Sequence, residues 1–223
     1  MMSSTTKSTL EAYERWAQVY PPVAHNPLMR AEQQSMLDVW PNVAAGRVLD
    51  LACGSGRYSR LLLEANAAEV IAVDFCIPML RQVAQAHRVC ASMMQLPFQA
   101  AAFDCVVSGL ALGHATDLRL WMMEVARVLR PGGTLLYSDF HPAAAQAGMT
   151  RSFKDEADAT WTVPHSVYDV ACQRDALAAA GLRIEAVKEV RLGLELTEAF
   201  PGSERIYRDW PGLPVVLVVR ASK

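Results

Sequence analysis

The chain has 223 residues and a formal net charge of −2, with 52% hydrophobic and 20% charged residues. This composition excludes an intrinsically disordered chain, and no basic run suggests nucleic acid as the main partner. The five cysteines are scattered without a C-x-x-C pair, so neither a metal site nor a disulfide framework is predicted. We expect a cytoplasmic α/β protein, since neither a secretory signal nor a membrane-spanning run is apparent.

The first predicted elements are two helices, at residues 9–19 and 29–40, with Pro21, Pro22 and Pro27 between them. From residue 47 onward, short apolar strands alternate with helices. Strands are expected at residues 47–51, 69–73, 89–93, 103–109, 134–138, 182–190 and 213–220. Helices are expected at residues 57–65, 77–87, 117–129 and 166–180.

Strands that are apolar throughout and separated by helices favour a parallel sheet that is covered on both faces. Two segments fall outside this scheme. Residues 1–40 are predicted to form an N-terminal helical lid on a domain formed by residues 41–223. Residues 139–165 leave the fifth strand at the edge where open parallel sheets bind ligands, so this insertion is predicted to lie on the substrate side.

A glycine-containing turn follows the first strand, where residues 48–56 read VLDLACGSG. Gly54 and Gly56 let the backbone approach a ligand, and the helix that begins next offers unpaired N–H groups. Asp50 ends the first strand. Asp74 ends the second strand, where a carboxylate can accept both hydroxyls of a ribose. These residues together predict a ribose-containing ligand.

The same turn distinguishes between ribose-containing cofactors. The dinucleotide fingerprint requires a third glycine, and Ser59 stands at that position. Asp50 would repel a pyrophosphate, whereas it would suit a cationic amine. A ligand with an amine at one end and a ribose in its middle describes S-adenosylmethionine better than NAD.

The motif VLDLACGSG resembles motif I of the class I S-adenosylmethionine-dependent methyltransferases. The resemblance covers roughly residues 47–138 and continues through IAVD, LPF, FD and EVARVLRPGG, in that order. The chain is similar to the small-molecule subgroup that includes ubiquinone/menaquinone- and biotin-pathway methyltransferases. This resemblance implies a Rossmann-like α/β fold with a seven-stranded, mostly parallel sheet, helices on both faces and an antiparallel last strand.

The resemblance implies S-adenosylmethionine as the cofactor, with Asp50 at its methionine amino group and Asp74 at its ribose hydroxyls. Ser92 stands where the family often has an aspartate near the adenine, so a neutral and weaker contact is expected there. The further cofactor-binding residues expected from the resemblance are Ala52, Gly54, Gly56, Phe75, Ser92, Met93, Ser108 and Tyr20.

Methyl transfer requires the nucleophile to be held in line with the methyl group and water to be excluded. A general base is needed only when the nucleophile carries a proton at the working pH. His141, just after the fifth strand, is predicted as that base. His114, Trp161 and His165 are expected on the acceptor side.

The predicted function is in-line transfer of a methyl group from S-adenosylmethionine to oxygen, nitrogen or carbon of a small-molecule acceptor. One alternative is carboxyl methylation of a carrier-bound acyl group, for which Arg30, Arg151 and Lys154 are the suggestive charges. Another is a non-catalytic, S-adenosylmethionine-binding partner protein. No nucleic-acid or membrane partner is expected, and the sequence does not distinguish a monomer from a homodimer.

Overall fold

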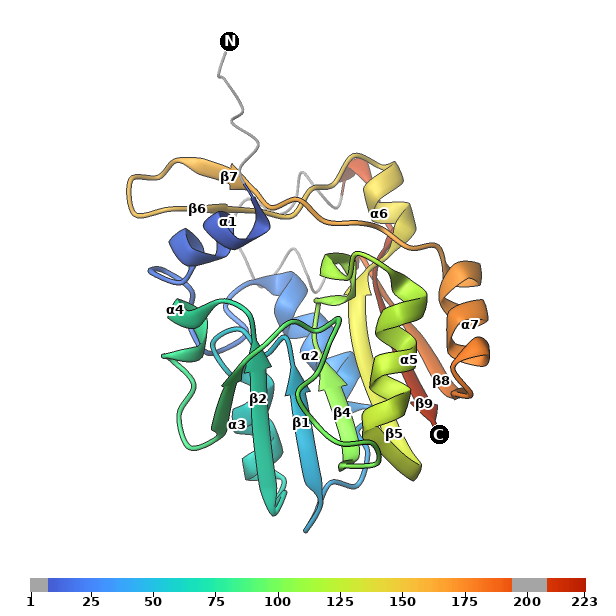
Figure 1. Ribbon diagram of the computed structural model, residues 1–223. Helices are drawn as coiled ribbons and strands as arrows, with labels where there is room; N and C mark the ends of the chain where they lie inside the picture. Colours follow the sequence, from blue (N-terminus) through green and yellow to red (C-terminus); the bar gives the residue numbers. More distant parts are fainter. Residues whose placement is uncertain (1–7, 194–207) are drawn as a thin grey trace.

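The computed structural model describes residues 8–193 and 208–223. Its centre is a seven-stranded sheet in the order β3-β2-β1-β4-β5-β9-β8 (Figure 1). The strands are β1 (Arg47–Leu51), β2 (Glu69–Asp74), β3 (His87–Cys90), β4 (Phe103–Ser108), β5 (Leu129–Phe140), β8 (Arg183–Arg191) and β9 (Pro214–Ser222). β9 runs antiparallel to both β5 and β8, while β1 to β5 pair in parallel. The expected mostly parallel sheet with an antiparallel last strand is therefore confirmed.

Helices cover both faces of the sheet, with α5 and α7 on one side and α2 and α3 on the other (Figure 1). The helices are α1 (Thr9–Trp16), α2 (Pro27–Leu37), α3 (Arg57–Glu64), α4 (Ile77–Leu80), α5 (Leu118–Val128), α6 (Pro142–Gln146) and α7 (Val170–Ala179). A short 3-10 turn, η1 (Leu112–His114), follows β4. In the described part of the chain, no helix combines the length and the apolar character needed to cross a bilayer.

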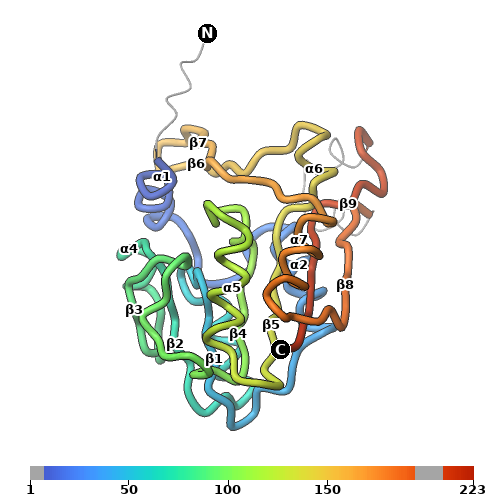
Figure 2. Tube along the Cα trace, turned by 45° about the vertical axis from the view of Figure 1, so that its right-hand side comes forward, coloured from blue at the N-terminus to red at the C-terminus, as the bar shows by residue number. Residues whose placement is uncertain are grey.

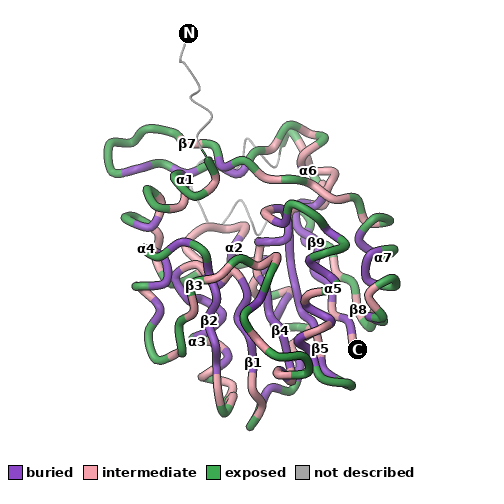
Figure 3. The backbone as a smooth tube through the Cα atoms, viewed as in Figure 1, coloured by how far each residue is buried: buried purple, intermediate pink, exposed green. Residues whose placement is uncertain are grey.

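The strands β1, β2, β4 and β9 are buried because they carry mainly apolar side chains, whereas the edge strands β3 and β8 carry several charged and exposed residues. Leu49 and Trp121 belong to the cluster on the α5 side, whereas Val48, Met36 and Leu62 belong to the cluster on the opposite side. Buried backbone accordingly lies mainly on the inner strands of the sheet, and exposed backbone lies mainly on helices, loops and the edge strands (Figure 3). Burying each such side chain stabilises the folded state by about 1.5–3 kcal/mol. The sheet is therefore a stable base for the loops at its edge.

Several predicted elements have different bounds in the structure. The helix expected at 77–87 is limited to α4, and the chain continues through turns before β3. Gln85 has a φ of 63°, a left-handed conformation that does not fit the expected continuation of the helix to residue 87. β3 therefore begins at His87, two residues before the expected start. β5 begins at Leu129 rather than at 134, and its pairing with β4 shifts register across the intervening turn.

Parts of the two segments predicted to lie outside the sheet, α1 and residues 139–165, meet above its carboxyl edge, whereas α2 packs on a face of the sheet. Residues 139–165 form α6 and then a hairpin of β6 (Ser152–Lys154) and β7 (Thr160–Thr162). This hairpin lies beside α1 in both views (Figures 1 and 2). Arg15 pairs with Asp155 at 2.8 Å, and the Trp16 and Phe153 rings stack with their centroids 4.6 Å apart. We call α1 and residues 152–162 together the roof.

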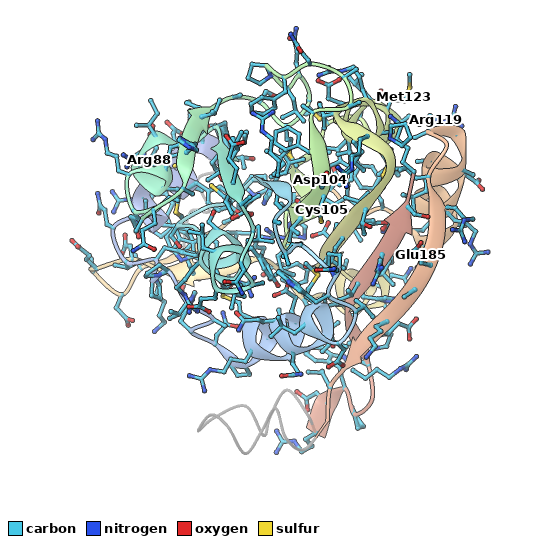
Figure 4. The ribbon with its side chains drawn as sticks, turned by 90° about the horizontal axis from the view of Figure 1, so that it is seen from below. Arg88, Asp104, Cys105, Arg119, Met123 and Glu185 are labelled. Atoms are coloured by element: carbon cyan, nitrogen blue, oxygen red, sulfur yellow. The ribbon has the colours of Figure 1, made fainter. Side chains whose placement is uncertain are left out.

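The opposite edge of the sheet is held by charged side chains. Asp104, which lies beside Cys105 at the start of β4, is seen there from below (Figure 4). Its carboxylate accepts a hydrogen bond from the backbone N–H of Arg47 and pairs with Arg130. These contacts join β1, β4 and the start of β5. Hydrogen bonds and an ion pair thus hold the strands together at the edge of the sheet opposite the roof.

Candidate active site

A cavity of about 800 Å³ lies between the roof and the carboxyl ends of β1, β2 and β4. Its walls are mostly apolar. Parallel sheets bind their ligands at this edge, where the loops diverge. Of the residues predicted from the sequence, the following line the cavity: Asp50, Ala52, Gly54, Asp74, Phe75, Ser92, Met93, Tyr20 and His114.

The turn after β1 brings its backbone to the cavity wall. Gly54 has a φ of 54° and Gly56 a φ of 87°, in the left-handed region that favours glycine. A Cβ atom on Gly56 would lie 3.1 Å from both Cγ atoms of Val83, so the turn also packs tightly against the segment after α4. α3 begins directly after Gly56, and Gly54 and Ser55 line the cavity.

Asp50 is a buried carboxylate at the end of β1. Its Oδ2 accepts a hydrogen bond from Ser59 Oγ at 2.6 Å, and it forms no ion pair within the described ranges. Burial raises the pKa of Asp50 to about 6. A buried carboxylate without a cationic partner is costly, and a ligand ammonium would compensate it. Ser59, which stands at the third position of the glycine fingerprint, is thus the residue that makes this contact.

Asp74, at the end of β2, holds two loops by hydrogen bonds and also lines the cavity. Its Oδ2 accepts a hydrogen bond from Gly54 N and its Oδ1 one from Cys76 N, both at 2.8 Å. The carboxylate therefore fixes the loops after β1 and β2, which is the capping role that a purely structural aspartate would have. Each oxygen has a second lone pair, and Asp74 also lines the cavity, so it remains able to accept from a ribose. Burial raises its pKa.

Phe75 and Met93 lie next to Asp74 in the cavity wall, and the adjoining Ser92 lines it as well. Phe75 is 38% exposed, which is unusual for a large aromatic side chain and leaves its ring available for stacking. Its ring meets that of Tyr13 edge to face, with centroids 6.4 Å apart. This part of the wall could therefore hold a flat heterocycle.

A polar cluster of Tyr13, His114 and Arg151 forms a second part of the cavity wall, which we call the Arg151 end. Tyr13 Oη lies 2.8 Å from His114 Nε2, and Arg151 Nη1 lies 2.9 Å from the same nitrogen. Because a guanidinium can only donate, His114 Nε2 is the acceptor and the imidazole is neutral. Burial and the charge of Arg151 lower the pKa of His114 to about 2. His114 is therefore a hydrogen-bond acceptor at neutral pH and cannot act there as a base with a useful proton affinity.

Arg151 is the centre of this cluster. It donates from Nη1 to the Leu110 carbonyl at 2.6 Å and from Nη2 to Asp139 at 3.1 Å. The side chains of Arg151 and Asp139 are only 6% and 5% exposed, so the pair is buried. The guanidinium also lies over the Phe140 ring, 4.9 Å from its centroid. Arg151 thus connects the insertion to the loop after β4 and to α1.

A second buried carboxylate, Glu32 on α2, lies behind the cavity wall. Its Oε2 accepts from Arg57 Nη1 at 2.7 Å, and its Oε1 accepts from Tyr58 Oη at 2.7 Å. Ser138 Oγ at the end of β5 donates to the same carboxylate. Arg57 and Tyr58 line the cavity, whereas Glu32 does not. Sequence analysis did not identify Glu32, because its partners are at least 25 residues away.

His141, predicted as the catalytic base, is not among the residues that line this cavity. Its Nδ1 accepts a hydrogen bond from Ala143 N and so caps α6, and its Nε2 lies 3.5 Å from Glu189. Trp161 donates to Asp155 within the roof, and His165 packs against Phe140 with ring centroids 5.6 Å apart. Neither of these two residues lines the cavity, and nor do Gly56 and Ser108. The insertion reaches the cavity instead through Phe140 and residues 149–152.

A family model described as a methyltransferase domain matches residues 49–137. The chain is 37% identical over 118 residues to a malonyl-[acyl-carrier protein] O-methyltransferase of Enterobacter lignolyticus, covering 51% of this chain and 47% of the relative. It is 38% identical over 117 residues to a demethylmenaquinone methyltransferase of Corynebacterium urealyticum, covering 51% and 48% of the two chains. The chain thus spans about half the length of the curated relatives it matches.

The fold is similar to that of a solved methyltransferase structure. A crystal structure of an S-adenosylmethionine-dependent methyltransferase from Mesorhizobium loti aligns with a TM-score of 0.71 at 24% identity, over 86% of this chain and 98% of that one. The matched region contains the turn after β1, Asp50 and Asp74. Residues 49–137 therefore carry a match to the methyltransferase domain that the motifs predict, on a fold shared with S-adenosylmethionine-dependent methyltransferases.

Proposed function

We propose that the chain transfers the methyl group of S-adenosylmethionine to a small-molecule acceptor by in-line displacement. The observation that carries this proposal is the pair of carboxylates on one cavity, Asp50 without a cationic partner and Asp74 with free acceptor capacity. Asp50 would hold the ammonium of the donor and Asp74 its ribose hydroxyls. Phe75 and Met93 would flank its adenine. The sulfonium supplies an already activated methyl group when the donor is bound.

The remaining groups of the cavity would orient the acceptor and exclude water. Holding two reactants in line can lower a barrier by about 7–11 kcal/mol, so the protein needs no nucleophile of its own. At the Arg151 end, His114 is neutral, and burial raises the pKa of Tyr13. We infer that the acceptor arrives with a free electron pair, as an amine or an anion, and that no histidine acts as its base.

We further propose that residues 1–40 act as the lid of this cavity. Tyr13, Trp16 and Tyr20 from this region line it, and Met29 on α2 does so too. The roof contacts between α1 and the hairpin would keep this lid closed over the donor. Residues 1–7 of the predicted lid lie outside the described residues.

A carrier-bound carboxylate is the second candidate acceptor, because a buried arginine lies in the cavity wall. Arg151 could orient a carboxylate by charge-assisted hydrogen bonds. The relative from Enterobacter lignolyticus is named as a methyltransferase of such a carrier-bound group. Asp139 already compensates the charge of Arg151, so this acceptor would have to share the guanidinium. The other two charges suggested from the sequence, Arg30 and Lys154, do not line the cavity.

The proposal is tested by ligand binding and by methyl transfer. Calorimetry should show binding of S-adenosylhomocysteine and none of NAD. Label from methyl-labelled S-adenosylmethionine should then be followed with a panel of small amines and acids and with malonyl thioesters. Transfer to a free small molecule supports the first acceptor class, and transfer only to thioesters supports the second. Tight donor binding without transfer to any acceptor would favour a non-catalytic binding protein, and failure to bind either donor form would reject the proposal.

A further inference from the structure

The cavity extends from the donor residues toward the other half of the sheet. Asp50 and Asp74 lie at the ends of β1 and β2, whereas Leu110 follows β4 and Leu192 follows β8. β5 and β8 both pair antiparallel with β9, so their carboxyl ends lie at the same edge of the sheet. This edge therefore carries two regions of cavity wall, one over β1 and β2 and one over β4, β5 and β8.

The second region is aliphatic. Its side chains come from the start of α2, the turn after β4, the segment after α6 and the end of β8. We call them the aliphatic wall: Leu28, Leu110, Met149 and Leu192. All four belong to, or pack against, the hydrophobic cluster on the α2 side of the sheet. Leu28, Leu110 and Met149 are only partly buried, so they keep apolar surface that a ligand in the cavity could cover.

The sheet holds the aliphatic wall in place. Leu110 N donates a hydrogen bond to Ser138 O, and Leu192 N donates one to Leu213 O, both at 2.9 Å. α2, which carries Leu28, packs against β5, β8 and β9. The wall is therefore supported by the strands next to it and does not depend on a ligand for its shape.

The aliphatic wall contains no charged residue. Among the described residues that line the cavity, the charged ones are Asp50, Arg57, Asp74 and Arg151. Both arginines already pair with buried carboxylates, those of Glu32 and Asp139, and both aspartates are assigned to the donor. A charged group placed against the wall would lose its hydration without gaining a partner. The wall thus favours an uncharged, apolar group.

We propose that the aliphatic wall binds the body of the methyl acceptor, and that this body is an uncharged hydrocarbon that carries the nucleophilic amine or anion. This inference rests on the proposed function, because it names the acceptor class for the same cavity. The volume of about 800 Å³ is in the upper part of the range of about 300–1,000 Å³ for ligand sites, which leaves room for an acceptor beside the donor. A malonyl group, which is short and charged, would leave the wall uncovered.

Met149 and Leu192 are the specificity-determining residues of this wall. Both lie outside residues 49–137, to which the family model matches, whereas Asp50 and Asp74 lie inside that range. The unbranched thioether of Met149 adapts to irregular apolar shapes. The acceptor is therefore selected by residues that the matched domain does not contain.

The test measures how affinity changes with the length of a hydrocarbon. n-Alkylamines and n-alkanoates of three, six and eight carbons are titrated by calorimetry into the protein saturated with S-adenosylhomocysteine. In the series whose head group fits, each added methylene should tighten binding about threefold to fourfold, because it is buried against the wall. Met149→Gln and Leu192→Asn each make the wall polar at one place and should reduce this factor to about twofold or less. S-adenosylhomocysteine itself should bind within about twofold of the wild type in both variants.

Met123→Gln is the matched control. Met123 on α5 is 59% exposed and does not line the cavity, and it is labelled in the view from below (Figure 4). The same substitution at this position should leave the dependence on chain length unchanged.

Several outcomes would overturn the inference. If affinity in the wild type does not depend on chain length, or if no member of either series binds, the cavity has no site for a hydrocarbon body. A dependence that survives both wall variants, or that Met123→Gln reduces equally, would place the apolar site elsewhere. If Met149→Gln does not fold, Leu192→Asn decides in the same way. A wild type that does not bind S-adenosylhomocysteine would reject the proposed donor itself, a result distinct from failure of the wall in the donor-loaded protein.

Discussion

The two ends of the cavity are built in different ways. At the Asp74 end, the wall consists of the turn after β1 and the end of β2, so Asp74 and Gly54 are only 20 residues apart. At the Arg151 end, Tyr13 and His114 are 101 residues apart, and Arg151 is 138 residues from Tyr13. The first end depends on local motifs supported by the sheet. The second depends on a buried polar cluster that forms only after α1, η1 and the insertion have met.

This difference has an energetic consequence. The Asp74 end is held by backbone hydrogen bonds and by buried strands, so single substitutions there should mainly change ligand affinity. The Arg151 end is held by an ion pair that is almost fully buried, and loss of one partner leaves an uncompensated charge. Substitutions there should change stability as well as turnover.

The largest expected effect is on the Arg151 end. Arg151→Met should lower the free energy of unfolding by about 3–5 kcal/mol, because Asp139 would remain buried without its cation. Urea denaturation measures this change. The double variant Arg151→Met with Asp139→Asn should recover part of the loss, since the uncompensated charge is then removed. A loss below about 1 kcal/mol in the single variant would mean that the two ends are not held differently.

At the Asp74 end of the cavity, Asp50→Asn should lower the affinity for the donor but raise the stability of the fold. Asp50→Asn should weaken S-adenosylhomocysteine about tenfold to a hundredfold in calorimetry, because the charged partner of its ammonium is lost. The same variant should be more stable than the wild type at pH 8 by about 1–3 kcal/mol in thermal or denaturant unfolding, because the ionised buried carboxylate is removed. Lower stability together with unchanged affinity would contradict the role of Asp50.

The pH dependence follows from the same group. Folding raises the pKa of Asp50 from 3.8 to about 6, so the folded state binds this proton more tightly than the unfolded state. Its contribution to stability therefore falls as the pH rises from about 4 to about 6 and is constant above that range. The affinity for S-adenosylhomocysteine should fall as the pH drops below about 6, approaching tenfold per unit. Calorimetry at pH 5, 6 and 8 tests this, with Asp50→Asn as the variant that should lose the trend.

A smaller effect is expected for the hydroxyl of Tyr13. Tyr13→Phe removes its hydrogen bonds to His114 and Arg151 but keeps the ring in the roof. Turnover should fall about threefold to tenfold, whereas the affinity for S-adenosylhomocysteine should stay within threefold, because the hydrogen bonds of the hydroxyl join it to His114 and Arg151 and not to Asp50 or Asp74. Steady-state kinetics and calorimetry on the same preparation measure the two quantities. Equal losses in both would show that this end also serves the donor.

The smallest effect is expected for His141. His141→Ala should leave turnover within about twofold and lower stability only slightly, because the side chain caps the short α6 outside the cavity. The pH profile of turnover should not change. A large loss of turnover without loss of stability would restore His141 as a candidate base.

Local patterns allowed the sheet and the Asp74 end to be predicted. The apolar run at 47–51 and the following glycines determine a strand and a turn whatever the rest of the chain does. Asp50 and Asp74 follow from their places at strand ends. Asp139 and Glu32 were not predicted, because a carboxylate in the sequence carries no sign of which distant cation it will meet. His141 was expected at the site because it follows β5. The chain turns into α6 at this point, and the imidazole caps that helix.

The contacts within the roof also bear on the order and timing of events during catalysis. Asp50, Tyr13 and Trp16 line the same cavity, so under the proposed lid a product at Asp50 would leave when α1 moves away from the hairpin. That movement has to separate the Arg15–Asp155 pair and the Trp16–Phe153 stack at the same time. Lid opening of this kind frequently limits enzyme turnover. We expect product escape to set the steady-state rate, with a rapid first turnover followed by a slower, viscosity-sensitive phase.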